Sequence, residues 1–234
     1  MSMSSADDAP EIVLTADGSH SVRSHRFAVD YHSIHGAVQE SRHVFLQAGL
    51  ELLMLEGPAE VRILEMGFGT GLNALLVRDF ARRHPSIPFS YHTLERFPLT
   101  EDAVGRLNYP EQLDLPASDL LELHERSWET LHALGDNFTF CKSRNDWLQR
   151  PPADWTVRPM DLIFYDAFAP ASQPELWTPA AMAIAFDLLR PGGTLVTYCA
   201  KGQFKRDLRA VGFTVEALPG PPGKREMTRA IRPA

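Results

Sequence analysis

Short apolar segments alternate along this chain with longer segments whose apolar residues recur at helical spacing. Val61–Leu64 has the composition of a buried strand, and it is followed by Leu72, Leu75, Leu76 and Phe80, which fall on one face of a helix. The same change of pattern recurs towards the C-terminus. It predicts a doubly wound α/β fold, with a mainly parallel sheet and helices on both of its faces.

The pattern also gives approximate boundaries. The expected order is strand 61–66, helix 72–83, strand 89–95, helices near 100–107 and 117–134, strands 137–141 and 161–166, helix 179–189, strand 194–199, helix 202–211, and strands 213–218 and 225–231. The last two strands are joined by LPGPPGK, which is too short to hold a crossover helix. We therefore expect them to pair as an antiparallel C-terminal hairpin at one edge of the sheet.

The N-terminal part of the chain does not follow this alternation. Residues 13–31 carry turn residues between short apolar stretches and predict a small β hairpin, and residues 38–55 are expected to be helical. Residues 1–10 are polar and are expected to be disordered. We expect residues 11–234 to form a single domain, in which about 11–56 are an N-terminal extension.

Size and composition narrow the class of protein. A chain of 234 residues with 44% apolar residues can bury a full core. Its longest apolar stretches are strand-sized and its N-terminus is polar, so we expect no membrane span and no secretory signal. Cys141 and Cys199 are too few for a disulfide framework or a zinc site, which favours a cytoplasmic protein with reduced thiols.

The distribution of charge is uneven. The net charge is −7, yet residues 201–234 hold eight Lys and Arg against three Asp and Glu, a net of +5, so residues 1–200 carry −12. A basic C-terminal face on an acidic body is compatible with local docking of a polyanion such as a nucleic acid. It is equally compatible with a solvated helix face and a charged hairpin.

The most informative motif lies between the first strand of the main fold and the helix that follows it. It reads E-x-G-x-G-x-G, with Glu65 ahead of Gly67, Gly69 and Gly71. Without Cβ atoms, the glycines let a ligand lie against the backbone, near the free N–H groups of the next helix. An ordinary tight turn is the alternative.

The spacing of the glycines indicates which ligand fits. A dinucleotide fingerprint needs its third glycine three residues after the second, where this chain has Leu72. The pattern suits a cofactor without a pyrophosphate, S-adenosylmethionine, whose amino-acid part packs on the turn. Glu95 ends the next apolar stretch, where a carboxylate can accept hydrogen bonds from both ribose hydroxyls.

A second candidate residue, Asp166, ends the strand DLIFYD. The loop after it contains Pro170 and Pro174, which stiffen it. A carboxylate at a strand tip, next to a rigid loop with Phe168 and Trp177, can hold a planar substrate that bears an amine, and Asp166 can accept a proton from that amine. Alternatively, Asp166 caps the next turn and Trp177 belongs to the core.

Other patterns exclude several kinds of chemistry. Five of the histidines cluster in the N-terminal third, but none has the spacing that a metal requires, so no metal site is expected and most should be on the surface. The chain has no G-x-S-x-G or Walker A motif. Hydrolase and NTPase mechanisms therefore lack a starting residue.

Five segments resemble the methyltransferase half of the MnmC family. They are GFGTGLN, LERFPLT, DAFAPASQPELWT, LLRPGGTLVTYCAKGQFKRDLRAVGF and GPPGKREM, and the likeness extends from about His32 to Ile231. The third and fifth segments together are far more specific than a glycine motif alone. That family makes 5-methylaminomethyl-2-thiouridine at the wobble position of certain tRNAs. The resemblance implies the class I S-adenosylmethionine-dependent methyltransferase fold, which is Rossmann-like.

The resemblance also implies roles for individual residues. Cofactor contacts are expected at Glu65, Met66, Gly67, Phe68, Gly69, Thr70, Gly71, Asn73, Glu95 and Asp166, with Glu95 on the ribose. Asp166 is the expected catalytic residue because it would meet the substrate amine. Together with the loop and charge patterns above, the substrate and tRNA side is expected at Phe168, Pro170, Trp177, Lys205, Arg206, Lys224 and Arg225.

The chain departs from the family at one position. Where the family commonly has Gly-Asp after the third strand, this chain has CKSRNDWL, with Ser143 at the acidic position and Asp146 as the nearest carboxylate. Ser143 or a backbone group is therefore the expected contact to adenine. In bifunctional members a flavin-dependent oxidase domain follows, whereas this sequence stops at Ala234, so we expect a stand-alone methyltransferase without FAD.

These observations predict an N-methyltransferase that converts 5-aminomethyl(-2-thio)uridine in tRNA to its 5-methylaminomethyl form. A methyl sulfonium is already activated, so the protein mainly has to align it with a neutral amine, and no metal is needed. The expected partner is tRNA, with a separate oxidase or aminomethyl-forming enzyme upstream. A small-molecule amine N-methyltransferase of the same fold and a non-catalytic tRNA-binding protein are the alternatives.

Overall fold

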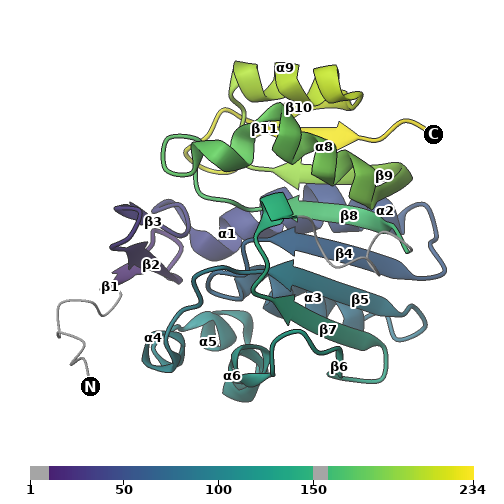
Figure 1. Ribbon diagram of the computed structural model, residues 1–234. Helices are drawn as coiled ribbons and strands as arrows, with labels where there is room; N and C mark the ends of the chain where they lie inside the picture. The colour runs from purple at the N-terminus through teal and green to yellow at the C-terminus, as the bar shows by residue number, and fades with distance from the viewer. Residues whose placement is uncertain (1–10, 150–157) are drawn as a thin grey trace.

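The computed structural model describes residues 11–149 and 158–234 (Figure 1). The disorder expected for residues 1–10 lies outside the described residues. Two sheets are present in the described part of the chain, a small one of three strands near the N-terminus and a central one of eight strands.

The central sheet has the strand order β10-β11-β9-β8-β4-β5-β7-β6. Its five inner strands are parallel to one another, and they are β9 (Leu189–Thr197), β8 (Met160–Tyr165), β4 (Val61–Met66), β5 (Phe89–Leu94) and β7 (Phe138–Ser143). The order reverses at β4, since the chain passes outwards through β5 and β7 and then returns to β8. The mainly parallel α/β sheet predicted from the sequence is confirmed.

The two edges of the sheet are antiparallel. At one edge, β10 (Thr214–Pro219) and β11 (Glu226–Ile231) form the predicted C-terminal hairpin, and β11 pairs with β9. At the other edge, the short strand β6 (His132–Ala133) pairs with β7. The connection between β10 and β11 is too short for a crossover helix, and the two strands pair antiparallel as expected.

Helices cover both faces of the sheet (Figure 1). The side chains of β8 alternate between the two layers, because Leu162 and Phe164 join the core under α3 (Leu72–Arg82), whereas Ile163 and Tyr165 join the core under α8 (Pro179–Leu188) and α9 (Gly202–Val211). The first of these cores also contains the helical segment formed by α1 (Ala37–Ser41), η2 (Arg42–Glu51) and α2 (Leu52–Met54). That segment matches the helix expected at 38–55.

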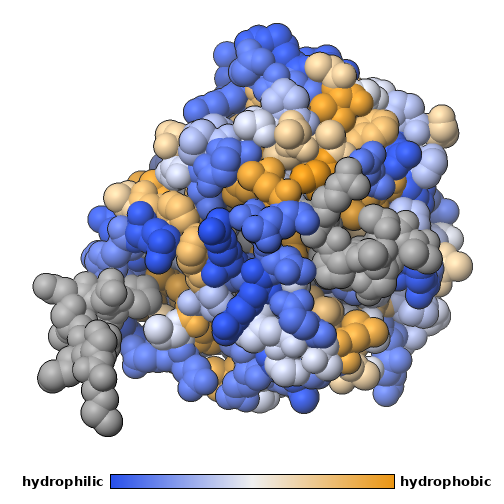
Figure 2. Space-filling model, viewed as in Figure 1, coloured by the Kyte–Doolittle hydropathy of each residue, from blue (hydrophilic) through white to orange (hydrophobic). Residues whose placement is uncertain are grey.

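Local sequence explains where the helices on the second face begin and end. At the start of α8, the Thr178 hydroxyl accepts a hydrogen bond from the N–H of Ala181 (3.3 Å), and Pro179 occupies the first helical turn. At the end of α9, Gly212 adopts a left-handed conformation (φ 119°), as is common for a glycine after a helix. Figure 2 shows hydrophilic side chains gathered over α9 at the top of the molecule.

The N-terminal extension forms the small sheet of β1 (Glu11–Leu14), β2 (His20–Ser24) and β3 (Val29–Asp30), all antiparallel. The predicted hairpin is thus present, with a third short strand. Two side chains attach this sheet to the rest of the molecule. Asp17 accepts a hydrogen bond from the N–H of Gln39 (2.9 Å), and the Asn108 amide donates to the carbonyl of Gly18 (2.9 Å).

One predicted helix was wrong in extent. The helix expected near 117–134 ends early, as α6 (Ala117–Glu125). The helix expected near 100–107 is present as α4 (Glu101–Gly105), and a short helix that was not expected, α5 (Tyr109–Leu113), lies between the two. The chain leaves helical conformation at Arg126 (ψ 143°), and the N–H of Glu129 then bonds to the carbonyl of Lys142 (2.9 Å). Residues 126–131 form bends and turns, and His132 and Ala133 pair with β7. This pairing is a tertiary constraint that overrides helix propensity.

Candidate functional site

The candidate site lies where the strand order reverses, at the carboxyl ends of β4 and β8. The two loops that leave these strands touch each other, because the N–H of Asp166 bonds to the carbonyl of Met66 (3.0 Å). A Cβ atom on Gly67 would lie 2.7 Å from the carbonyl oxygen of Asp166. In open α/β sheets, ligands bind in the crevice at such a switch point.

The predicted glycine turn begins the site. Gly67, Gly69 and Gly71 all have positive φ (97°, 49° and 77°), and Gly71 stands directly before α3. A Cβ atom on Gly69 would lie 2.9 Å from the ring of Tyr31, and one on Gly71 would lie 2.7 Å from Nε2 of His124. The three glycines therefore allow both the backbone conformation and the close approach of neighbouring groups. No side chain caps the N-terminus of α3.

Glu95 connects this turn to the end of β5. One carboxylate oxygen accepts a hydrogen bond from the N–H of Gly69 (2.9 Å), and the other accepts one from the N–H of Phe97 (2.6 Å). Burial raises the pKa of Glu95, while these backbone donors favour its charged form. Each oxygen still has a lone pair for a further donor, because a carboxylate oxygen accepts up to two hydrogen bonds.

Asp166 lies on the other side of the turn and is half-buried. Its carboxylate accepts a hydrogen bond from the amide of Asn73 (2.9 Å), a residue of the first turn of α3. Burial, followed by the negative charge of Glu40, raises the pKa of Asp166 to about 7. At neutral pH this carboxyl group can therefore both hold and release a proton.

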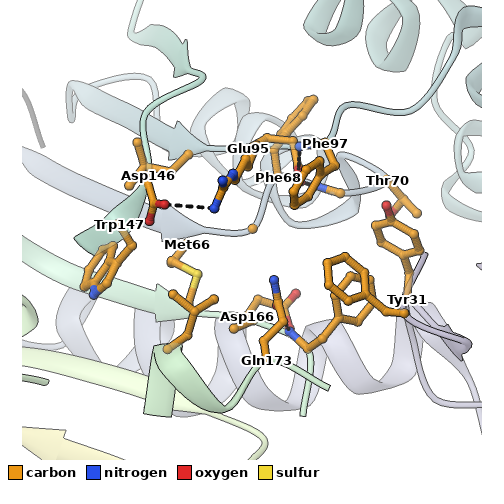
Figure 3. A pocket seen from close by; sticks show the side chains of 18 of the residues that line it. Tyr31, Met66, Phe68, Thr70, Glu95, Phe97, Asp146, Trp147, Asp166 and Gln173 are labelled. Carbon is orange, nitrogen blue, oxygen red and sulfur yellow. Dashed lines mark hydrogen bonds and ion pairs between the residues drawn. The ribbon is translucent and has the colours of Figure 1, made fainter. Parts of the chain in front are cut away.

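These residues line one cavity, drawn in Figure 3, whose walls come from five stretches of chain, 26–32, 66–73, 94–97, 145–147 and 166–176. Asp146 and Trp147 lie at one end of the cavity, and Tyr31 and Thr70 lie at the other (Figure 3). Glu95 and Asp166 face each other across the middle (Figure 3). The cavity therefore has two ends with a carboxylate on each side between them.

Known proteins share this arrangement of sequence and fold. A family described as S-adenosyl-L-methionine-dependent methyltransferase matches residues 149–233. The bifunctional tRNA 5-methylaminomethyl-2-thiouridine biosynthesis protein MnmC of Methylibium petroleiphilum is 33% identical over 205 residues, covering 86% of this chain and 31% of that protein. The crystal structure of MNMC2 from Aquifex aeolicus superimposes with a TM-score of 0.75 at 25% identity, covering 96% of this chain and 71% of that chain.

The chain is thus similar in sequence and fold to MnmC proteins, and its C-terminal part matches a family of S-adenosyl-L-methionine-dependent methyltransferases. A second relative, the MnmC protein of Aromatoleum aromaticum, is 33% identical over 237 residues and covers 95% of this chain. The chain spans about a third of the length of the curated relatives it matches, 31% and 35% for these two. Among residues 11–149 and 158–234, no helix has the length and apolar character of a membrane span.

Most of the residues that the MnmC resemblance assigned to the cofactor do line the cavity. They are Met66, Gly67, Phe68, Gly69, Thr70, Asn73, Glu95 and Asp166. Gly71 does not line it and instead makes room for His124.

Glu65 was assigned to the cofactor with them, but it is completely buried and lies outside the cavity. Its carboxyl accepts a hydrogen bond from Thr93 (2.8 Å), and burial, with the charge of Asp166, raises its pKa well above the usual value. Because neighbouring side chains of a strand point to opposite faces, Met66 reaches the cavity and Glu65 does not.

Ser143, the expected adenine contact, is also completely buried and does not line the cavity. Its carbonyl accepts the N–H of Glu95 (2.9 Å). Asn145 and Asp146, two and three residues later, line the cavity instead. Asp146 forms an ion pair with Arg96 (2.9 Å) and accepts the N–H of Leu148 (3.0 Å).

The loop after β8 divides the predicted substrate residues. Phe168 lines the cavity, whereas Pro170 and Trp177 do not. Trp177, in η4 (Pro174–Trp177), is buried against Tyr165 and Phe204, and its indole N–H donates to the carbonyl of Phe168 (2.8 Å). Trp177 is therefore a core residue whose indole N–H supports the backbone of the loop. The sequence alone left open whether it belongs to the core or to the substrate site.

The predicted tRNA residues near the C-terminus lie outside the cavity. Lys205 pairs with Glu226 (2.7 Å), and Lys224 pairs with Glu40 and lies 4.0 Å from the centre of the Tyr198 ring. Arg206 bonds to the side chain of Gln203 (2.7 Å), and Arg225 is exposed. Two of the four cations are thus partly neutralised by carboxylates.

Sequence reasoning missed the contribution of the N-terminal extension. Arg26, Phe27, Tyr31 and His32 all line the cavity. His32 joins the glycine turn directly, because its Nε2 lies 2.7 Å from the hydroxyl oxygen of Thr70. Burial lowers the pKa of His32 to about 4, so the ring is neutral at physiological pH. The resemblance begins at about His32, so no motif pointed to the residues before it.

Proposed function

We propose that this protein transfers a methyl group from S-adenosylmethionine to the amine of 5-aminomethyluridine, with or without a 2-thio group, at the wobble position of tRNA. The observation that supports this most is Asp166, a half-buried carboxylate with a pKa of about 7 that lines the cavity beside the glycine turn. A primary amine must lose a proton when its nitrogen is methylated, and a positioned group with a pKa near the working pH suits that task.

The residues in the cavity fit the cofactor. Gly67 and Gly69 line the cavity with backbone alone, and their positive φ values hold the turn in a conformation that other residues rarely adopt. Both oxygens of Glu95 keep a free lone pair for ribose hydroxyls. Asn145 and Asp146, at the end of the cavity beyond Glu95, supply polar groups for adenine. When bound, the cofactor supplies an activated methyl group.

Asp166 and Asn73 act on the acceptor. Asn73 donates to one carboxylate oxygen of Asp166, which fixes the direction of the carboxylate. Asp166 accepts the proton that the amine nitrogen loses as it forms its bond to carbon. The residues that line the cavity align the amine with the methyl donor.

The choice of tRNA as substrate is supported by the relatives, which are named for biosynthesis of 5-methylaminomethyl-2-thiouridine in tRNA. The aminomethyl group must then come from another enzyme, an oxidase or an aminomethyl-forming enzyme. We propose that the protein acts in the cytoplasm, where such tRNAs are found.

The test is methyl transfer in vitro. The purified protein is incubated with methyl-labelled S-adenosylmethionine and tRNA that carries 5-aminomethyl-2-thiouridine, and the nucleosides are analysed by mass spectrometry. We expect the label in 5-methylaminomethyl-2-thiouridine and none in the same tRNA with an unsubstituted wobble uridine. Transfer to small amines but not to tRNA would establish the small-molecule alternative, and cofactor-independent tRNA binding alone would establish the non-catalytic one.

A further inference from the structure

Four aromatic side chains gather at the end of the cavity opposite Asp146. Phe27 and Tyr31 come from the N-terminal extension, Phe97 follows β5, and Phe168 follows β8; all four line the cavity and all are only partly buried. The ring of Phe168 lies 4.8 Å from those of Phe27 and Tyr31, and Phe27 lies 5.9 Å from Phe97. Partly exposed aromatic rings inside a cavity are a stacking surface for a planar ligand.

Phe168 is held firmly in this group, which we call the aromatic end. Its N–H donates to the side-chain oxygen of Gln173 (3.0 Å), and its carbonyl accepts the indole N–H of Trp177 (2.8 Å). The carbonyl of the preceding residue, Ala167, accepts the hydroxyl of Tyr198 (2.7 Å). Three hydrogen bonds therefore fix the backbone around Phe168, two residues from Asp166, and a ligand that stacks there lies beside that carboxylate.

Tyr31 is fixed to the glycine turn. Its ring lies where the Cβ of Gly69 would be, and the next residue, His32, contacts the hydroxyl of Thr70. The aromatic end is thus attached to the same turn that we assign to the cofactor. Any movement of the extension relative to the turn would have to break these contacts.

Two cations stand at the rim of the aromatic end. The guanidinium of Arg26 lies 4.3 Å from the centre of the Phe97 ring, and that of Arg96 lies 5.3 Å from it. Arg96 is paired with Asp146. Arg26 is exposed and forms no ion pair within residues 11–149 and 158–234, so its charge is available to a phosphate.

The position of Glu95 separates the aromatic end from the cofactor. If Glu95 binds the ribose, adenine lies towards residues 145–147, which follow the neighbouring strand β7. Tyr31 lies at the far end of the cavity from Asp146 (Figure 3), and Phe168, whose ring contacts that of Tyr31, is two residues from Asp166. The aromatic end is therefore free to bind the molecule that receives the methyl group.

We propose that Phe27, Tyr31, Phe97 and Phe168 form the stacking site for the pyrimidine base of the acceptor, turned out of its RNA strand, and that Arg26 contacts a neighbouring phosphate. This inference rests on the proposed function. The rings of the aromatic end already touch one another, so the base stacks on their exposed faces and not between two of them. Turning a base out of its stack is how enzymes reach atoms of a nucleotide, and unpaired bases of RNA loops stack readily on aromatic side chains.

The test compares two RNA hairpins with the sequence of an anticodon stem-loop. One carries 5-aminomethyluridine at the wobble position and the other has no base there, and binding is measured with S-adenosylhomocysteine present. We expect the wild type to prefer the complete RNA by about 5- to 100-fold, the range for one stacked base. Phe27→Leu should lower this preference several-fold while its affinity for S-adenosylhomocysteine stays unchanged.

The matched control is Phe186→Leu. Phe186 is also partly buried, and the guanidinium of Arg232 lies 4.7 Å from its ring centre, but it lies on α8 and does not line the cavity. This variant should keep the preference of the wild type. For the rim, Arg26→Gln should lower the slope of log affinity against log salt by about 0.7 to 0.9, the value for one phosphate contact.

The outcomes distinguish a failure of this inference from a failure of the proposed function on which it rests. If the wild type methylates tRNA and Phe27→Leu still prefers the complete RNA as strongly as the wild type does, the stacking site is wrong and the function stands. The same holds if Phe27→Leu loses cofactor affinity in parallel. If the wild type transfers no methyl group to tRNA, the proposed function fails and the inference falls with it.

Discussion

Asp166 directly follows β8 and lines the cavity, where the amide of Asn73 donates a hydrogen bond to its carboxylate. A pKa of about 7 means that about half of the molecules carry the charged form at neutral pH. The charged form is the one that can accept a proton. The residue therefore gains its proposed role from burial, which is also what makes its charge costly to keep.

The first prediction concerns this charge. Asp166→Asn keeps the shape of the side chain but cannot accept the proton, so single-turnover methyl transfer should fall by about 10²- to 10⁴-fold. Cofactor affinity should change little. Higher pH should partly restore the rate, because more of the amine is then neutral without help. A rate close to that of the wild type would leave Asp166 as a cap of the loop.

The pH dependence supplies the control. In the wild type, kcat/KM should rise as pH passes about 7. In Asp166→Asn this step near pH 7 should be absent, and the rate should rise only at the higher pH at which the amine itself loses its proton. Since the folded-state pKa is raised, the contribution of Asp166 to stability is lost as pH increases from 3.8 to about 7. Asp166→Asn has no carboxyl group to titrate, so the melting temperature of the variant should not fall for this reason as pH increases over this range.

At the scale of single residues, the sequence indicated correctly those positions that lie at the carboxyl ends of the predicted strands. The glycines, Glu95 and Asp166 line or border the cavity because strand ends in a parallel sheet meet at one edge. Glu65 and Ser143 were assigned from their place in a motif, but both are completely buried and outside the cavity. Glu65 lies on the face of β4 opposite Met66, whereas Ser143 is in register with Leu94, which does line the cavity. The side of a strand to which a residue points depends on register, which a motif does not contain.

The glycine turn packs against the loop that follows the neighbouring strand β8. The loops after β4 and β8 touch at Gly67, where φ is 97° and a Cβ would lie 2.7 Å from the backbone oxygen of Asp166. The collision is with backbone, which cannot rotate away as a flexible side chain can.

We predict that Gly67→Ala destabilises the protein by about 1–3 kcal/mol, the usual cost of a residue forced into such a conformation. Urea unfolding would measure this. Gly105→Ala is the matched control, because a Cβ at Gly105 in α4 meets nothing within 4 Å and its φ is not positive. That change should be neutral or stabilising. Equal stabilities of the two variants would contradict the tight contact at the turn.

Elements of the central sheet were predictable because each strand is a short apolar run between turn residues, as in β4 and β8. The end of α6 and the strand β6 were not, because they depend on pairing with β7, a partner later in the chain. The wall formed by residues 26–32 was missed for the same reason. Tyr31 reaches the cavity only because the small sheet docks against the glycine turn, a contact across 38 residues between Tyr31 and Gly69.

At the scale of the whole molecule, we propose that residues 11–234 form one domain. The small N-terminal sheet is attached by hydrogen bonds to both α1 and the loop before α5, and it completes the cavity. The basic residues near the C-terminus do not all present a free charge, although the sequence alone would suggest that they do. The C-terminal segment carries a net charge of +5, but Lys205 and Lys224 are each paired with a glutamate.

The last prediction separates the paired from the unpaired cations. If the C-terminal face contacts tRNA phosphates, replacing Arg206 and Arg225 by Ala should lower the slope of log affinity against log salt by about 1.4 to 1.8, the value for two lost contacts. Replacing Lys205 and Lys224 should lower it less, because glutamates already offset their charge. Cofactor affinity should be unchanged in both. Unaltered slopes would assign this face to solvent.

The docking of residues 26–32 against the glycine turn has a consequence for how such an enzyme can diverge. These residues contribute no strand to the eight-stranded sheet, and the groups that we assign to the cofactor come from other parts of the chain. On our proposal, substitutions at Arg26 and Phe27 therefore change which acceptor is taken without disturbing the donor or the folding core. Exchanging this short stretch between relatives is then a direct route to enzymes with a new choice of nucleoside.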